Sequence, residues 1–208
     1  EMKKIIIILG LLITISFGTT FDEGIDAINK KDFKSALKIF EKLAFKNDAK
    51  AQYALGIMYS NENNAVRQDY SKAKEWYEKA AIQGHADAQY NLGIMYEYGY
   101  GVKRDYSKAK EWYEKAAMQG NPGAQYNIAV MYYRGYGVNK DYTKSKYWLE
   151  KAAFQEYPMA QNNLGFMYEN GQVVKQDKKV AKELYRKACN NGLQEGCDAY
   201  KILNQQGY

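Results

Sequence analysis

The stretch LGIMYEYGYGVKRDYSKAKEWYEKAAMQG, residues 92–120, contains the signals for two helices and the turn between them. In its first part, Leu92, Met95 and Tyr96 follow at steps of three and four residues, the spacing of one helix face. Gly99 and Gly101 then interrupt this spacing, and glycine readily adopts the positive φ angles of a tight turn. The stretch therefore predicts a helical hairpin.

The second helix of this hairpin has predicted signals at both ends. Asp105 is placed to accept hydrogen bonds from the first free N–H groups, and Gly120 stands where a C-terminal cap is expected. Aspartates recur at the same phase of the sequence, at Asp69, Asp141 and Asp177.

The body of the second helix divides into a packed face and a solvated face. Ala109, Trp112 and Ala116 are predicted to form the packed stripe. Glu111 and Lys115, four residues apart, are predicted to form an exposed ion pair.

The same unit recurs with a period of 36 residues, and one copy has an extra residue in its loop. The predicted repeats are residues 51–87, 88–123, 124–159 and 160–195. Residues 19–50 are predicted to form an N-terminal capping hairpin, and residues 196–208 a C-terminal capping helix. A single hairpin buries too little apolar surface to be stable alone, so the repeats must stack into an all-α array.

The N-terminal residues have the pattern of a signal peptide. Lys3 and Lys4 precede an apolar run, Ile5–Ile15, and Ser16-Phe17-Gly18 resembles a cleavage site. We expect residues 1–18 to be removed and the protein to be exported, as a periplasmic or secreted protein without membrane insertion after cleavage. The run is shorter than the roughly 20 residues that span a bilayer; a retained anchor is the alternative.

The distribution of charge along the chain argues against nucleic acid as a partner. The formal net charge is +6, but lysines and glutamates are interspersed along the chain. Such mixing is typical of a solvated surface and not of a nucleic-acid-binding patch. We therefore expect no nucleic-acid partner, and we expect a monomer.

The two cysteines, Cys189 and Cys197, stand at the junction between one helix and the next. Cys189 takes the place of Ala117 in the repeat, and Cys197 that of Gln89. In an oxidising compartment we expect a disulfide that stabilises the C-terminal end by about 2.5 kcal/mol. Two buried thiols are the alternative. His85, the sole histidine, is distant in sequence, so neither a metal nor another cofactor is expected.

The pattern A-x-x-x-L-G-x-M-Y-x-x-G-x-G-V followed by D-Y-x-K-A-x-x-W-Y-E-K-A-A resembles the Sel-1-like repeat family, which is tetratricopeptide-like, over residues 51–197. The resemblance implies a right-handed α-solenoid whose first helices line a concave groove that binds a protein or peptide. The cysteine spacing resembles the bacterial cysteine-rich Hcp branch, in which nearly every repeat has such a pair. A plainer Sel-1-like protein with a single pair is the alternative.

The resemblance also implies which residues face the groove. Carrying over the tetratricopeptide groove gives Tyr90, Asn91, Ile94, Tyr98, Tyr126, Asn127, Val130, Tyr133, Arg134, Asn163 and Phe166. Asparagine amides can bind the backbone of an extended peptide, and tyrosines supply apolar contact. Two alternatives remain open. The tyrosines could instead pack between repeats, or the groove could bind a glycan such as peptidoglycan, since sugars stack on aromatic faces.

An enzymatic alternative comes from the same resemblance, because some Hcp proteins are described as penicillin-binding proteins or weak β-lactamases. The S-x-x-K pattern of such enzymes occurs at Ser35, Ser71 and Ser107, each with a lysine three residues on. No S-D-N or K-T-G element accompanies it, and its recurrence at the repeat phase indicates a helix surface. A binding scaffold without catalytic residues is therefore the favoured prediction.

Overall fold

The computed structural model describes residues 19–62 and 65–208. These residues form eleven helices and no strand. In chain order the helices are α1 Phe21–Asn29, α2 Phe33–Ala44, α3 Ala49–Ser60, α4 Tyr70–Ile82, α5 Ala86–Tyr98, α6 Tyr106–Met118, α7 Pro122–Arg134, α8 Tyr142–Phe154, α9 Pro158–Asn170, α10 Lys178–Asn190 and α11 Gln194–Gln205. The predicted signal peptide, residues 1–18, lies outside the described residues.

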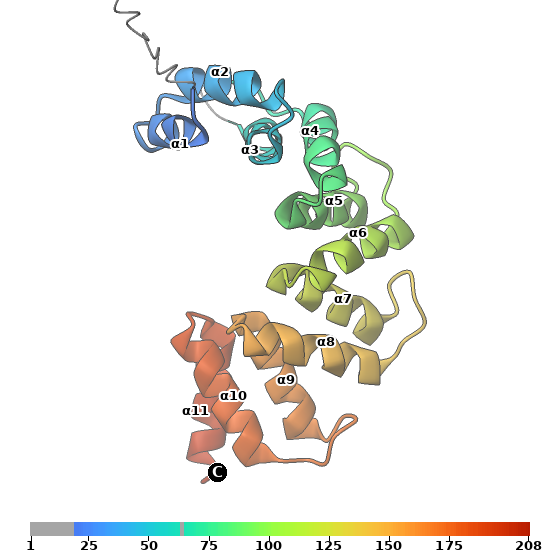
Figure 1. Cartoon of the computed structure of the whole chain (residues 1–208). Coiled ribbons are helices and arrows are strands. Elements are labelled where there is room, and N and C mark those ends of the chain that lie inside the picture. The colour runs from blue at the N-terminus through green and yellow to red at the C-terminus, as the bar shows by residue number, and fades with distance from the viewer. Residues whose placement is uncertain (1–18, 63–64) are drawn as a thin grey trace, which may run out of the picture.

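The helices pair in chain order into five hairpins, and α11 packs on the last of them. Each helix packs mainly against its neighbours in sequence. Figure 1 shows the hairpins following one another along an arc from α1 to α11. The prediction of an all-α solenoid is confirmed.

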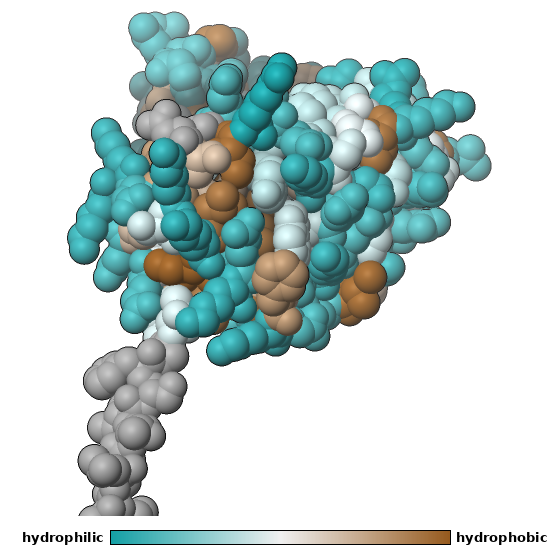
Figure 2. All heavy atoms as spheres, turned by 90° about the horizontal axis from the view of Figure 1, so that it is seen from above, coloured by the Kyte–Doolittle hydropathy of each residue, from teal (hydrophilic) through white to brown (hydrophobic). Residues whose placement is uncertain are grey.

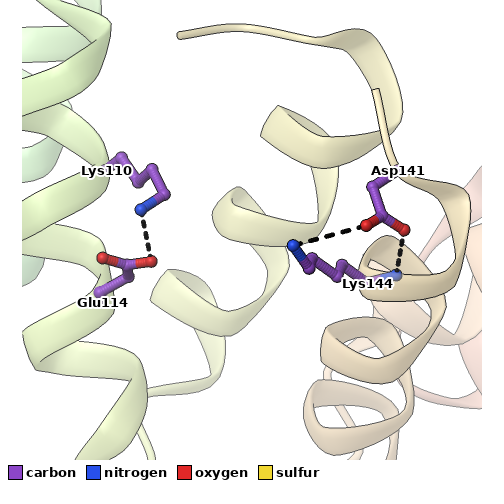
Figure 3. Close-up of polar contacts among 4 residues, drawn as sticks. All are labelled: Lys110, Glu114, Asp141 and Lys144. Carbon is purple, nitrogen blue, oxygen red and sulfur yellow. Dashed lines mark hydrogen bonds and ion pairs between the residues drawn. The ribbon is translucent and has the colours of Figure 1, made fainter. Parts of the chain in front are cut away.

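The helix ends follow from the residues that the repeat places there. Asp69, Asp105, Asp141 and Asp177 cap α4, α6, α8 and α10, as predicted. Figure 3 shows Asp141, which accepts a hydrogen bond from the backbone N–H of Lys144 at 2.9 Å and pairs with its ammonium group at 3.5 Å. Because a capping aspartate satisfies otherwise unpaired N–H groups, each second helix begins at a fixed place.

The packed face of α6 differs from the prediction in one position. Tyr113, not Trp112, is the fully buried aromatic residue of this helix, and Trp112 is only partly buried. Ala109, Tyr113 and Ala116 are spaced by four and three residues, so they share one buried helix face, on which Tyr113 lies against Gly93 of α5.

The predicted ion pair between Glu111 and Lys115 is wrong for a related reason. The Lys115 ammonium group lies over the Trp112 ring, 4.2 Å from its centroid. The ion pair of α6 joins Lys110 and Glu114 at 2.6 Å (Figure 3). Lys115 therefore makes a cation–π contact with the partly buried Trp112 ring and not the ion pair with Glu111 that the helix spacing predicted.

A buried glutamine joins each hairpin to the one before it. Gln89, for example, is 5% exposed, and its Nε2 donates to the carbonyl oxygen of Ala81 on α4 at 3.0 Å. Its Oε1 accepts from Gln119 Nε2 at 2.7 Å. The same backbone link is made by Gln52, Gln125 and Gln161.

The disulfide occupies the corresponding place at the C-terminal end. Cys189 on α10 and Cys197 on α11 are bonded, as predicted. Cys197 occupies the position of the buried glutamine in the earlier repeats. Cys189 occupies the position of the alanine whose carbonyl oxygen accepts the hydrogen bond from that glutamine. A covalent bond thus replaces the hydrogen bond between hairpins at the end of the solenoid. Such a bond is typical of an oxidising compartment.

Candidate functional site

The first helices of the four repeats, α3, α5, α7 and α9, form what we call the first-helix face. Besides its sequence neighbours, α5 packs directly against both α3 and α7. Two cavities open between adjacent members of this face. We call them the α3–α5 cavity and the α7–α9 cavity.

The α7–α9 cavity has a volume of about 330 Å³. Its lining includes six of the eleven residues predicted for the ligand groove: Tyr126, Val130, Tyr133 and Arg134 of α7, and Asn163 and Phe166 of α9. Two residues of α8, Ser145 and Leu149, complete it from below, where they are 1% and 2% exposed. Side chains from two repeats therefore line one cavity.

The α3–α5 cavity, of about 400 Å³, contains two more predicted residues, Asn91 and Ile94. Tyr53 and Ile57 of α3 line it from the other side. Burial raises the pKa of Tyr53 to about 12, with a smaller contribution from Asp87. The phenol is therefore protonated at neutral pH and available as a neutral hydrogen-bond donor.

The remaining predicted residues, Tyr90, Asn127 and Tyr98, line neither cavity. Tyr90 is partly buried and packs between repeats: its ring centroid is 5.9 Å from that of Tyr113, and its ring lies against Gly123. Tyr98 is 61% exposed and stacks on Tyr100 at 5.7 Å.

A partly buried polar pair joins α6 to α5 within the second repeat. The Tyr113 hydroxyl donates to a carboxylate oxygen of Glu97 at 2.5 Å. Burial raises the pKa of Glu97, and the hydrogen bond from Tyr113 opposes this shift. The first-helix face thus holds a half-buried carboxylate at its centre and the Arg134 guanidinium farther along, so its charge is mixed.

The three predicted groove asparagines, Asn91, Asn127 and Asn163, are close to tyrosine hydroxyls of the preceding repeat. Asn163 Nδ2 donates to the Tyr126 hydroxyl at 3.4 Å. Burial raises the pKa of Tyr126, while Asn163 and Arg134 oppose the shift.

Ser145, Leu149 and Ala129 line the α7–α9 cavity but were not predicted as site residues. Their signal in the sequence is a departure from the repeat. Other repeats have alanine in place of Ser145, tyrosine in place of Leu149 and glycine in place of Ala129. A search for positions that break the repeat would have found all three.

A set of exposed apolar residues at the ends of second helices was also not predicted from the sequence. The second helices end in Phe45, Ile82, Met118 and Phe154, which are 74% to 90% exposed. Phe45 directly follows α2, and the other three are the last residues of their helices. We call these four residues the apolar row. Figure 2 shows, from above, a largely hydrophilic surface with separate hydrophobic patches.

The S-x-x-K residues lie on the surface of the second helices. Ser71 and Ser107 are exposed in the first turns of α4 and α6. Lys74 and Lys110 bond to Glu78 and Glu114, each at 2.6 Å, and these hydrogen bonds raise the pKa of both lysines. A lysine that acts as a general base requires the opposite shift.

Within residues 19–62 and 65–208, no group of three or more His, Cys, Asp or Glu side chains is arranged to hold a metal ion. None of the helices in that part of the chain has the length and hydrophobicity needed to span a membrane.

Comparison with known proteins identifies the repeat. The model of the Sel1 repeat matches residues 49–85, 86–121, 122–155 and 158–193. The first helices α3, α5, α7 and α9 begin at these same four residues, which lie two residues before the starts expected from the sequence. Among curated proteins, no match was found.

Solved structures are similar over most of the chain. A Sel1 repeat protein from Oxalobacter formigenes is 30% identical, with a TM-score of 0.77, over 85% of this chain and 72% of that one. A protective antigen of uropathogenic Escherichia coli strains, which displays an SLR fold, is 35% identical with a TM-score of 0.76, over 83% of this chain. This chain spans only 37% of the length of that antigen.

The predicted likeness to the cysteine-rich branch is seen in the fold. The cysteine rich protein B of Helicobacter pylori has a TM-score of 0.51 and is 21% identical, over 65% of this chain and 97% of that one. The resemblance of the repeat pattern to the Sel-1-like family is confirmed by the match of the repeat model.

Proposed function

The chain belongs to the Sel1 repeat family, whose members generally mediate protein interactions, and from that premise we propose that it is an exported scaffold that binds an extended segment of a partner protein on its first-helix face. One observation carries the proposal. Eight of the eleven predicted groove residues line two cavities that open on this face.

The chemistry of the two cavities suits a peptide. Each combines apolar walls with neutral hydrogen-bonding groups: Ile57, Ile94 and Asn91 in one, and Val130, Phe166 and Asn163 in the other. Apolar pockets select side chains, and amides can pair with the N–H and C=O groups of an extended backbone. Ile57 and Phe166 are 38% and 44% exposed, so part of this apolar surface is open to a ligand.

Selection from a library of displayed peptides, followed by calorimetry, tests the proposal on the oxidised protein. The test variant Ile57→Glu/Phe166→Glu puts charge into both cavities. The matched control Ile82→Glu/Phe154→Glu makes the same changes in the apolar row. Because all four side chains are exposed, we expect both variants to fold.

We expect selected peptides to bind the test variant at least about tenfold more weakly than the wild-type protein, since apolar contacts in the cavities are replaced by charge. The control variant should bind like the wild type. The reverse result, with binding lost only in the control, would move the binding site to the apolar row and reject the proposal.

Export is the second part of the proposal. It is supported by the signal-peptide pattern of residues 1–18 and by the disulfide, a bond that persists in oxidising compartments. Mass spectrometry of the protein recovered from the periplasm or culture medium should find Thr19 as the first residue. An intact N-terminus on membrane-bound protein would favour the retained anchor.

Glycan binding is a second candidate, favoured by exposed tyrosine rings beside the α3–α5 cavity. Tyr98 and Tyr100 are 61% and 42% exposed and stack on one another. Tyr70 stacks on Tyr100 in turn, with 5.2 Å between the ring centroids. Calorimetry with soluble peptidoglycan fragments tests this candidate: binding that is lost in Tyr98→Ala supports it, and no binding rejects it.

A further inference from the structure

The third repeat breaks a packing rule that the other three repeats follow. In those repeats a tyrosine of the second helix is 3% exposed or less and lies against a glycine of the first helix. The pairs are Tyr77 with Gly56, Tyr113 with Gly93 and Tyr185 with Gly165. In the third repeat the corresponding pair is Leu149 with Ala129.

The tyrosine hydroxyl also links the two helices of its hairpin. Tyr113 donates to Glu97 at 2.5 Å and Tyr185 to Glu169 at 2.7 Å, while the hydroxyls of Tyr77 and Ser60 are 3.2 Å apart. Leu149 has no hydroxyl and is shorter than tyrosine. In its repeat the α7–α9 cavity reaches down to α8, and its volume of about 330 Å³ lies at the lower end of ligand pockets.

The floor of this cavity contains a polar atom without a partner. Ser145 is 1% exposed and lines the cavity, and its hydroxyl makes no hydrogen bond among the described residues. The other repeats have alanine at this position: Ala73, Ala109 and Ala181. A buried hydroxyl without a hydrogen-bond partner lowers the stability of the fold, so Ser145 gives the fold no advantage over alanine. A ligand with a polar tip would satisfy it.

The rim of the cavity contains a positive charge. Arg134 is exposed, lines the cavity and forms no salt bridge with a carboxylate of the described residues. Guanidinium groups bind carboxylates through two parallel hydrogen bonds. Tyr126, Tyr133 and Phe166 surround the same opening with aromatic rings.

We propose that the α7–α9 cavity is the anchor site for a tyrosine side chain of the partner peptide, next to an acidic residue of the same peptide. The ligand ring takes the space that the repeat's own tyrosine fills elsewhere, its hydroxyl pairs with Ser145, and the acidic residue binds Arg134. This inference rests on the proposed peptide-binding function and specifies its ligand.

Blocked dipeptides are sufficient probes, because each contains both recognised groups. Amide signals of α7, α8 and α9 are followed by NMR while N-acetyl-Tyr-Glu-amide is added to the oxidised protein. N-acetyl-Phe-Glu-amide lacks the hydroxyl, N-acetyl-Tyr-Gln-amide lacks the charge, and N-acetyl-Ala-Glu-amide lacks the ring. We expect the Tyr-Glu probe to bind most tightly, with the loss of the charge weakening binding about tenfold.

Three variants test which protein residues recognise the ring, the hydroxyl and the charge of the probe. Ala129→Gly/Leu149→Tyr restores the pair of the other repeats, so it should fold and should abolish binding of the Tyr-Glu probe. Ser145→Ala, which also restores the repeat, should remove the preference for tyrosine over phenylalanine. Arg134→Ala should remove the preference for glutamate over glutamine.

Two results would overturn the anchor site. The Tyr-Glu probe could shift signals outside α7, α8 and α9, or the Ala129→Gly/Leu149→Tyr variant could bind it as tightly as the wild type. Selected peptides that lose affinity in Ile57→Glu/Phe166→Glu but not in Ala129→Gly/Leu149→Tyr would reject the anchor and leave the proposed function standing. Selected peptides unaffected by either variant would reject both.

Discussion

The ring of Tyr113 lies so close to Gly93 that a Cβ atom on the glycine would come within 2.4 Å of ring atoms Cδ1 and Cε1. Real Cβ atoms do not approach other atoms so closely, and both residues are buried, Tyr113 within a packed core cluster. The pair therefore fixes how near α5 and α6 can come. In the third repeat the same positions hold Ala129 and Leu149, so the two residues change together.

A double-mutant cycle should reveal this dependence. Gly93→Ala is expected to destabilise the protein by about 1–3 kcal/mol through overpacking. Tyr113→Leu should cost about 2 kcal/mol, because it leaves a cavity and removes the hydrogen bond to Glu97. The double variant recreates the pair of the third repeat and should cost at least about 1 kcal/mol less than the sum. Urea unfolding measures all four proteins; strictly additive costs would contradict the prediction.

The half-buried Glu97 should make stability depend on pH. Burial raises the pKa of Glu97 in the folded state above the ordinary value of 4.5. At pH values between these two pKa values, the folded state therefore binds more protons than the unfolded state. The free energy of unfolding should consequently fall as pH rises from about 4.5 through the folded pKa. Glu97→Gln should lack this decrease and gain stability relative to the wild type toward neutral pH.

Urea unfolding of both proteins between about pH 4 and pH 8 checks the sign. Glu111→Gln, at an exposed site of α6, controls for the loss of one carboxylate. If the difference between the wild type and Glu97→Gln stayed constant across this range, the burial of Glu97 would have no energetic consequence.

The disulfide and the buried glutamines should be interchangeable in part. Cys189→Ala/Cys197→Ala is expected to lower the free energy of unfolding by about 2.5 kcal/mol, the entropy lost on closing a short loop. Cys189→Ala/Cys197→Gln places the residues of the other repeats there and should recover about 1 kcal/mol through the helix-to-helix hydrogen bond. Unfolding under oxidising conditions compares the three proteins, and equal stability of the two variants would show that the glutamine does not link these helices.

Hydrolysis of nitrocefin tests the enzymatic alternative. We expect no turnover by the oxidised protein, because Lys74 and Lys110 are paired with glutamates that raise their pKa, which keeps them protonated. Ser71→Ala/Ser107→Ala is the control. Turnover by the wild type that disappears in this variant would make these helix turns catalytic and would overturn the scaffold function.

The sequence predicted the local structure closely where one residue type has one physical role. Asp105 was expected at the helix start and Gly99 at a turn, and the structure has a capping bond at the first and a φ of 79° at the second. Pro122 begins α7, a position where its missing N–H group leaves no helix hydrogen bond unmade. These predictions held because caps, turns and helix starts depend on neighbouring residues only.

Side-chain partners across helices were harder to predict. Trp112 and Tyr113 are adjacent, and the helix spacing alone did not show that Tyr113 faces α5 while Trp112 packs against the preceding repeat. Eight of the predicted groove residues line cavities, whereas Tyr90 fills space between repeats. Which of these roles a tyrosine takes depends on the helix that lies opposite.

The sequence by itself determined the period, the hairpins, the caps and the place of the disulfide, because each follows from residues close together along the chain or at one repeat spacing. Only the tertiary structure decided where a cavity opens. Ala129, Ser145 and Leu149 come from two helices, and the space they leave is bounded by a third, α9. A cavity is volume that no side chain fills, and that volume depends on how closely all of the surrounding helices can pack.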